Sequence, residues 1–293
     1  MTLAELYASQ PNWLIGTVFI VSLLIGSFLN VVIHRLPIMM EREWRLQAEA
    51  ILNTAPQQDS GQPYNLITPR SACPQCHTQL SALQNIPVIS WLLLKARCAH
   101  CKHPISARYP LIELVTALLS AVVAWRFGFN WHMAAALVLT WTLIALSAID
   151  LDHQLLPDSL TLPLLWLGLA CSLMPNQLST ITTQEALMGA MVGYLSLWLV
   201  YHLFKLATGK EGMGYGDFKL LAALGAWLGW QMLPLIILLS ACVGAAVGIG
   251  LIFFRGRDHS IPMPFGPYLA AAGWIALLWG QQIVSTYLGF IQG

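Results

Sequence analysis

Residues 131–150 read WHMAAALVLTWTLIALSAID, a long apolar run that ends in a carboxylate at Asp150. A second cluster, Gly214-Tyr215-Gly216-Asp217, adjoins another apolar run. Ionised side chains at membrane depth are costly and tend to be functional. Two carboxylates from separate helices can share one proton and activate water. The two runs therefore predict membrane helices that bring a pair of carboxylates together.

The composition of the chain indicates a membrane protein. Of its 293 residues, 57% are hydrophobic and only 9% are charged, whereas a soluble domain has about 25% charged residues. The formal net charge is +1, so no domain-wide basic face is available to follow phosphates, which argues against nucleic acid as a partner. We therefore expect the chain to lie in the lipid of a membrane.

We predict an all-α polytopic membrane protein with about eight transmembrane helices, because bilayers require apolar stretches of about 20 residues. The predicted spans are 13–33, 109–125, 131–149, 159–174, 186–206, 217–230, 233–254 and 267–288. Several are short and interrupted by Gly or Pro, which is tolerated where neighbouring helices or a water-filled cavity satisfy the backbone. The first span is expected not to be a cleaved signal peptide, because Glu5 and no Lys or Arg precede it.

The distribution of basic residues predicts the orientation. With eight spans, one side of the membrane holds all Lys and Arg residues except Arg126. That side includes Arg35, Arg42, Arg45, Arg70, Lys95, Arg97, Lys102, Arg108, Lys205, Lys210, Lys219, Arg255 and Arg257. Cytoplasmic loops carry the excess of Lys and Arg. Residues 34–108 and both carboxylate clusters are therefore expected at the cytoplasmic face, with both termini outside.

Four cysteines in this polar segment have the spacing of a metal site. Cys73 and Cys76 form one Cys-x-x-Cys knuckle, and Cys98 and Cys101 form a second one. Two such knuckles complete a tetrahedral thiolate site for structural Zn²⁺, with no open position for chemistry. In a reducing cytosol a metal is favoured over two disulfides. Residues 41–65 add a short helical pattern and a Pro/Gln/Gly stretch, for which we expect an elaborated loop without chemistry.

The residues alone leave the role of the carboxylates open. Glycines at 214 and 216 permit unusual backbone angles and close approach of an extended strand, but small residues in membrane helices also serve packing. Asp158 is expected to cap the helix that follows it. A paired-carboxylate enzyme and a proton- or ion-coupled site are equally compatible with these features. Cys171 and Cys242 stand alone in apolar runs and are interpreted as structural.

Several motifs together resemble a known family. The Gly-Tyr-Gly-Asp of residues 214–217 is similar to the Gly-x-Gly-Asp motif of membrane aspartyl proteases, and Asp150, eight residues before Asp158, is similar to their other catalytic position. The knuckles are flanked by GSFLNVVIHRLP at residues 26–37 and RYPLIEL at residues 108–114. From about residue 13 to 288 the chain resembles the bacterial type IV prepilin peptidases that are also N-methyltransferases and are shared with type II secretion.

The resemblance implies a substrate and a reaction. Prepilins and pseudopilins would be cut after a Gly at the cytoplasmic face of the inner membrane, and the new amino terminus would be methylated from S-adenosylmethionine. Asp150 and Asp217 would be the catalytic pair, with Gly214, Gly216 and Asp152 supporting them. Residues 1–33 would form the first membrane helix, 34–108 a zinc-knuckle domain associated with methyl transfer, and 109–293 the peptidase domain.

Three further residues carry expectations. Lys219, two positions after Asp217, is expected to tune the site or to snorkel to the interface. Glu113, near the start of the second span, is either an interfacial carboxylate or a group that binds the new amine. Relatives often carry Gly where this chain has Ala96, and Ala would crowd a backbone angle that needs glycine.

Two alternatives remain at this stage. One is a zinc-ribbon membrane transporter that uses Asp150 and Asp217 as a relay, although the paired broken helices of a duplicated transporter are missing from the sequence. The other is a peptidase without methyl transfer, against which the cysteine tetrad argues.

Overall fold

The structure is a computed structural model that describes residues 3–52, 64–81, 83–174, 177–210, 212–255 and 263–292. Within these residues the chain is helical, and the only β-type pairings are the isolated bridges Ala72↔Gln79 and Arg97↔Pro104. It forms two compact units, Met1–Ala124 and Trp125–Gly293. The predicted all-helical class is confirmed.

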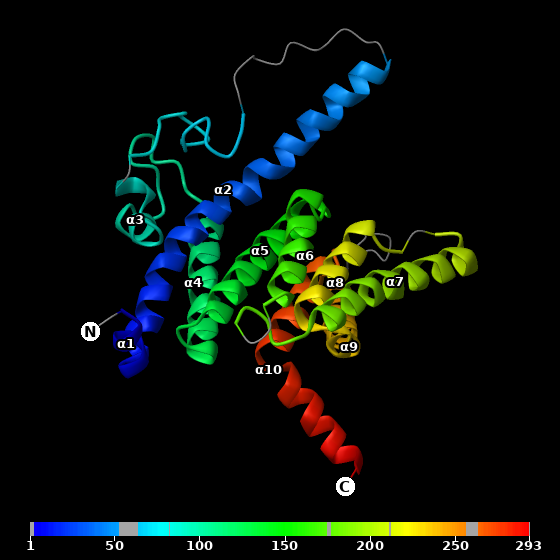
Figure 1. The fold of residues 1–293 in the computed structure, drawn as a ribbon. Coiled ribbons are helices and arrows are strands. Elements are labelled where there is room, and N and C mark those ends of the chain that lie inside the picture. Colours follow the sequence, from blue (N-terminus) through cyan, green and yellow to red (C-terminus); the bar gives the residue numbers. More distant parts are fainter. Residues whose placement is uncertain are drawn as a thin grey trace. The chain divides into compact units, whose positions relative to one another are not determined.

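The first unit is built on two long helices joined by the cysteine-containing segment (Figure 1). Its elements are α1 (Leu3–Ser9), α2 (Pro11–Leu52), η1 (Leu83–Asn85), α3 (Ile89–Leu93) and α4 (Arg108–Phe127). The backbones of α2 and α4 approach closely at Gly26, where an added Cβ would lie 2.7 Å from the Cα of Glu113. One turn along α2, the Asn30 Nδ2 donates a hydrogen bond to the Tyr109 carbonyl, at 3.1 Å.

The helix that contains the first predicted span is longer than expected. α2 continues through Pro37 to Leu52, so the short helical pattern expected after residue 41 is the continuation of this helix. An exposed ion pair one turn apart, between Arg45 and Glu41 at 3.7 Å, supports this extension. Residues 53–63 of the expected loop, like Arg257, lie outside the described residues.

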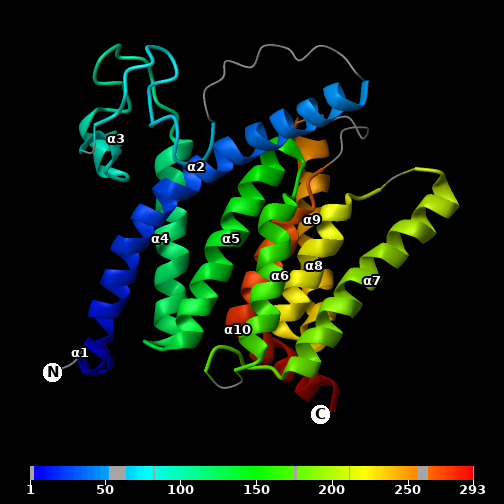
Figure 2. The same ribbon diagram turned by 45° about the horizontal axis from the view of Figure 1, so that its top comes forward.

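The second unit is a bundle with one helix buried on all sides. Its elements are α5 (Trp131–His153), α6 (Asp158–Ser172), α7 (Thr183–Thr208), α8 (Tyr215–Leu228), η2 (Trp230–Met232), α9 (Leu233–Arg255) and α10 (Gly266–Gln292). Figure 2 shows α8 between α6 and α7, and it also packs against α10. Every residue from Leu220 to Trp227 is buried, as expected for a helix that is apolar on every face.

Each of the eight predicted spans falls mainly on a described helix. Five segments are long and apolar enough to cross a membrane, namely Pro11–Leu52, Arg108–Phe127, Trp131–His153, Thr183–Thr208 and Trp230–Gly250. Asp158–Ser172 is apolar but shorter. Membrane character is therefore supported, while the number of eight crossings stays a prediction.

Glycine pairs allow α7 and α8 to pack backbone against backbone. A Cβ added to Gly225 would collide with the carbonyl oxygen of Gly189 on α7, and one added to Gly193 would lie 2.7 Å from the Leu221 oxygen. Small residues permit this close approach of helices in membranes. On the other side of α8, the Trp227 Nε1 donates to the Leu164 carbonyl of α6, at 2.8 Å. The position of α8 is thus fixed from both sides.

We expect Gly225→Ala to destabilise the bundle, because backbone atoms surround the new methyl group and cannot rotate away. Overpacking of this kind costs about 1–3 kcal/mol. Thermal melting of the purified protein in detergent would measure the loss. Gly16→Ala on α2 is the matched control, because an added Cβ there meets nothing within 4 Å. Equal melting temperatures for the two variants would contradict the close crossing.

Candidate functional site

Asp150 lies in the last turn of α5 and is buried, with 5% of its surface exposed. The helix begins after Asn130, whose side chain accepts a hydrogen bond from the Met133 N–H at 2.7 Å. It ends at Gln154, which adopts a left-handed conformation and donates its N–H to the Asp150 carbonyl. The N–H of Gly266, at the start of α10, donates to the Asp150 Oδ2 at 3.0 Å. This bond fixes the orientation of the Asp150 carboxyl group, and its donor is a backbone N–H rather than another side chain.

Asp217 occupies the third position of α8 and is also buried, with 7% of its surface exposed. Gly214 is the N-cap of the helix and has no side chain with which to cap it. Carboxylates are favoured near the N-terminus of a helix by its free N–H groups and its dipole. The Gly-Tyr-Gly-Asp motif therefore presents a buried carboxyl group on the first turn of the central helix.

The structure brings the two predicted carboxylates together. The charge of the Asp150 carboxyl group acts on the Asp217 carboxyl group. The Leu156 side chain packs against both Gly216 and Gly266. A Cβ on Gly216 would lie 2.7 Å from the Leu156 Cβ, and a Cβ on Gly266 would lie 3.1 Å from the Leu156 Cδ2. A Cβ on Gly266 would also lie 2.7 Å from the Asp150 Oδ2. Only glycine fits at 216 and 266.

Gly266 is a site residue that the sequence analysis missed. It precedes Pro267 at the start of a helix that is remote from both carboxylates along the chain. A glycine before a proline more often marks a turn, so nothing in the local sequence pointed to a contact with Asp150. Asp152, in contrast to Asp150, is exposed at the end of α5.

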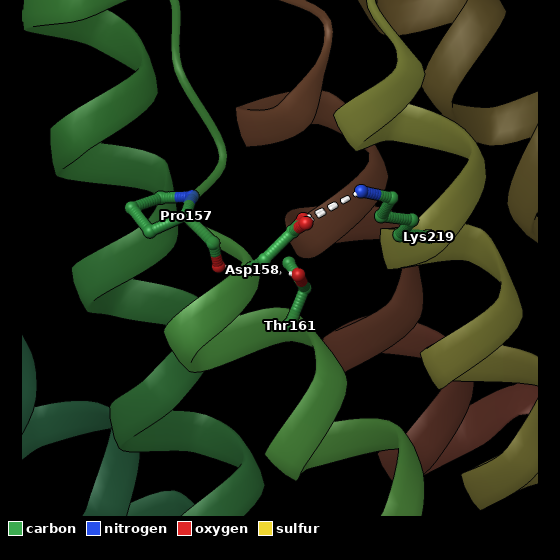
Figure 3. Close-up of polar contacts among 4 residues, drawn as sticks. All are labelled: Pro157, Asp158, Thr161 and Lys219. Carbon is green, nitrogen blue, oxygen red and sulfur yellow. Dashed lines mark hydrogen bonds and ion pairs between the residues drawn. The ribbon is translucent and has the colours of Figure 1, made fainter. Parts of the chain in front are cut away.

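Asp158 and Lys219 form an ion pair between the N-terminal ends of α6 and α8 (Figure 3). The Lys219 Nζ lies 2.7 Å from each carboxylate oxygen of Asp158. The expectation that Asp158 caps α6 is wrong. Pro157 is the N-cap without a side-chain bond, and Asp158 is already in the first turn. The sequence predicts that Lys219 tunes the site or snorkels to the interface. In the structure its ammonium group is held by Asp158, two positions along the chain from Asp217.

The two cysteine knuckles share one backbone pattern. The Cys73 N–H donates to the Thr78 carbonyl and the Cys73 carbonyl accepts from His77; the Cys98 N–H donates to His103 and the Cys98 carbonyl accepts from Lys102. His77 and Lys102 both have positive φ, at 55° and 59°. Each loop thus closes around its first cysteine and turns its two sulfurs in one direction, as the spacing predicts.

The four sulfurs gather at a single point, all within 4.8 Å of one another. The Sγ of Cys73 lies 3.7 Å from that of Cys101, and the Sγ of Cys76 lies 4.0 Å from that of Cys98. Two sulfurs at about 2.3 Å from a tetrahedral Zn²⁺ would lie roughly 3.8 Å apart. Hydrogen bonds with the side chain and backbone of Thr78 lower the pKa of the Cys76 thiol to about 6, whereas burial and hydrogen bonds with the neighbouring thiols raise the pKa of Cys101 to about 11, so Cys76 is the more readily ionised of these two thiols. These cysteines fit a four-coordinate metal. Elsewhere, Cys171 is buried and Cys242 is exposed.

Glu113 and Ala96 also lie in the first unit. Glu113 is buried, with 7% exposed, and its Oε2 accepts a hydrogen bond from the Val88 N–H at 2.8 Å. Ala96 has φ +59°, in the region that favours glycine. Its N–H donates to Trp91, and its carbonyl accepts from Ile105. Ala96 therefore connects α3 to the second knuckle at some conformational cost.

Comparisons with known proteins cover both units. The family described as Bacterial Peptidase A24 N-terminal domain matches residues 20–127, and the Type IV leader peptidase family matches residues 137–249. Three similar proteins are each called prepilin leader peptidase/N-methyltransferase. They come from Aeromonas hydrophila (59% identical over 98% of both chains), Stutzerimonas stutzeri (57% over 99% of both) and Pseudomonas aeruginosa (56% over 99% of both).

No solved structure gives a significant match. The relatives match over nearly the whole length of both chains, and both family matches fall on the segments that carry the cysteines and the carboxylates. The chain belongs to the type IV leader peptidase family, in agreement with the resemblance inferred from its motifs.

Proposed function

We propose that the chain cleaves the leader from type IV prepilins and type II secretion pseudopilins, and then N-methylates the new amino-terminal residue, with Asp150 and Asp217 as the catalytic pair. The proposal rests on two buried carboxyl groups that interact electrostatically in a chain whose relatives are named for both activities. The same membership favours the enzyme over the transporter alternative.

The pair acts as an acid and a base on one water molecule. One carboxylate takes a proton from the water, and the other, protonated, polarises the scissile carbonyl. The water oxygen then bonds to the carbonyl carbon, and the amine leaves with a proton. Because the carboxyl groups interact, they titrate as a unit. The Gly266 N–H holds the Asp150 Oδ2, so this carboxyl group is oriented before the substrate arrives.

The supporting residues shape the space around the pair. Gly216 lets Leu156 pack against the first turn of α8, and a Cβ on Gly214 would lie 3.9 Å from the Asp217 Oδ2. Leu156 fills the space beside Gly216, so it is the missing side chain of Gly214 that leaves room for an extended substrate strand beside Asp217. Asp152 supplies an exposed negative charge near the site, which suits a leader that carries basic residues.

The metal belongs to residues 34–108 in this proposal, and this segment is associated with methyl transfer. The four thiols would hold Zn²⁺ as a closed structural site that folds the segment, since no coordination position remains for a substrate. S-adenosylmethionine would supply the methyl group. Residues 109–293 would form the peptidase domain.

The placement in the cell follows from the basic residues. Because thirteen of the fourteen Lys and Arg side chains fall on one side of an eight-span arrangement, we place residues 34–108 and the carboxylate pair at the cytoplasmic face of the inner membrane. A prepilin with a basic leader in the cytoplasm and an apolar helix in the membrane would meet the pair there.

Asp150→Asn and Asp217→Asn should each reduce leader cleavage by roughly 10²–10⁴-fold, because each removes one partner of the acid–base pair. Mass spectrometry of a prepilin incubated with the purified variants would measure this. Asp152→Asn should show a much smaller loss. If either the Asp150→Asn or the Asp217→Asn variant accumulates in the membrane and still cleaves at the wild-type rate, the aspartyl mechanism is wrong.

Cys98→Ser should lower the bound zinc from one ion per chain, because it removes one of four ligands, and should expose the segment to proteases. Elemental analysis and limited proteolysis would show both effects. Cys242→Ser is the matched control, since this thiol is exposed on α9 and distant in sequence from the tetrad. A wild-type protein without metal would contradict the zinc site.

Asp158→Ala and Lys219→Ala should each lower the kcat of cleavage more than the stability, because the ion pair orients the turn of α8 that carries Asp217. An exposed pair contributes only about 0.2–1 kcal/mol to stability. The charge-exchanged variant, with Asp158→Lys and Lys219→Asp together, should recover part of the activity. Full activity in both single variants would limit the pair to a surface contact.

A further inference from the structure

The first unit contains a cavity that the peptidase reaction does not use. Its volume is about 890 Å³, and its walls come from α2, α4, α3 and both knuckles. Pockets for small ligands measure about 300–1,000 Å³, so a nucleoside of the size of S-adenosylmethionine fits. All the lining residues lie between Ser27 and Glu113. The cavity therefore belongs to the unit without the carboxylate pair.

The charge distribution in this cavity is uneven. Glu113 supplies the only carboxylate among the described residues that line it, and it is one of the most buried charged groups of the chain. The basic lining residues are His34, Arg35, Arg70, His77, His100 and His103. The carboxylate of a ligand would find partners among these basic groups, which leaves Glu113 for the amine of a second reactant. S-adenosylmethionine has a sulfonium, an ammonium and a carboxylate.

Aromatic rings and fixed backbone complete the walls. Tyr64, Trp91 and Tyr109 line the cavity, and such rings stack on a purine or attract a cation at their faces. The Trp91 Nε1 donates to the Ile105 carbonyl at 3.1 Å. Arg35 donates to the carbonyls of Asn65 and Pro69, at 2.9 and 2.5 Å. The walls are therefore positioned by hydrogen bonds before any ligand binds.

Glu113 has capacity beyond its structural bonds. Its Oε2 accepts from the Val88 N–H, and its carboxylate also accepts from the Ser27 side chain, but an ionised carboxylate has about four lone-pair positions on two oxygens. A further donor can therefore bind at the cavity. An α-amino group, with an ordinary pKa of about 7.7–8.0, is mostly protonated at neutral pH and must lose a proton before it can attack carbon.

We propose that this cavity binds S-adenosylmethionine and that Glu113 receives the amino group of the cleaved substrate beside it; this rests on the proposed methyl transfer. Glu113 takes one proton from the ammonium group. The nitrogen lone pair then bonds to the methyl carbon as the carbon–sulfur bond breaks, and its electron pair stays on sulfur as S-adenosylhomocysteine forms. The proton on Glu113 passes to solvent, and the product is the methylated ammonium.

Filling the cavity tests the binding site. Val31 lines it from α2, whereas Phe28 on the same helix is exposed and outside the lining. Val31→Trp should weaken S-adenosylmethionine binding at least tenfold in isothermal titration calorimetry with the full-length protein in detergent, and Phe28→Trp should bind like wild type. Ser90→Trp, on α3, is a second filling variant if Val31→Trp melts below the wild type. Unchanged affinity in a folded filling variant overturns the assignment.

Replacing the carboxylate separates amine capture from donor binding. Glu113→Gln keeps an acceptor for Val88, so its melting temperature and its affinity for S-adenosylmethionine should stay near those of wild type. Its methyl transfer to a pre-cleaved pilin peptide should fall roughly a hundredfold or more, the range of a lost general base. Methylation at the wild-type rate overturns the role of Glu113, and loss of donor affinity would mean that Glu113 binds the donor instead.

One comparison separates this inference from the proposed function. Asp150→Asn should bind S-adenosylmethionine with wild-type affinity, because Asp150 lies in the other unit. If the wild-type protein cleaves prepilin but Val31→Trp and wild type bind the donor equally, the cavity is wrong and the peptidase stands. If the wild type neither binds the donor nor methylates, the proposed methyl transfer itself fails.

Discussion

The burial of α8 is the constraint on which the second unit depends. A helix that is apolar on every side is stable only when neighbours surround it, and glycines bring α7 against one side while Trp227 bonds to α6 on the other. Asp217 stands on the first turn of this fixed helix. Its carboxyl group is thus positioned by packing along the rest of α8, and the same packing places it near Asp150.

The two units meet different physical demands. The second unit holds its carboxyl groups with backbone contacts from glycines, which resist movement and exclude larger residues. The first unit has little apolar core in its knuckle segment, where small folds usually need a metal or disulfides. Four thiols that converge on one point satisfy that need. The segment can then leave a cavity open, because its stability does not rest on filling the interior.

Local patterns predicted what depends on local physics. Apolar runs predicted the helix positions, and the Cys-x-x-Cys spacing predicted the gathering of Cys73, Cys76, Cys98 and Cys101, both confirmed. The helical pattern after residue 41 was predicted, but its continuity with the first span was missed, because the sequence becomes polar there. The roles of Gly266, Leu156 and the Asp158–Lys219 pair were missed because they arise from contacts between distant helices. The catalytic assignment of Asp150 and Asp217 stays a prediction.

Asp150 and Asp217 are expected to work as one acid–base unit, and the pH dependence of kcat/KM for leader cleavage is the measurement that checks this. A bell-shaped profile is expected, because one carboxyl group must be ionised and the other protonated. Added chelator should leave the shape of the profile unchanged. A profile without an acidic and a basic limb across the range in which the enzyme stays folded would contradict the account.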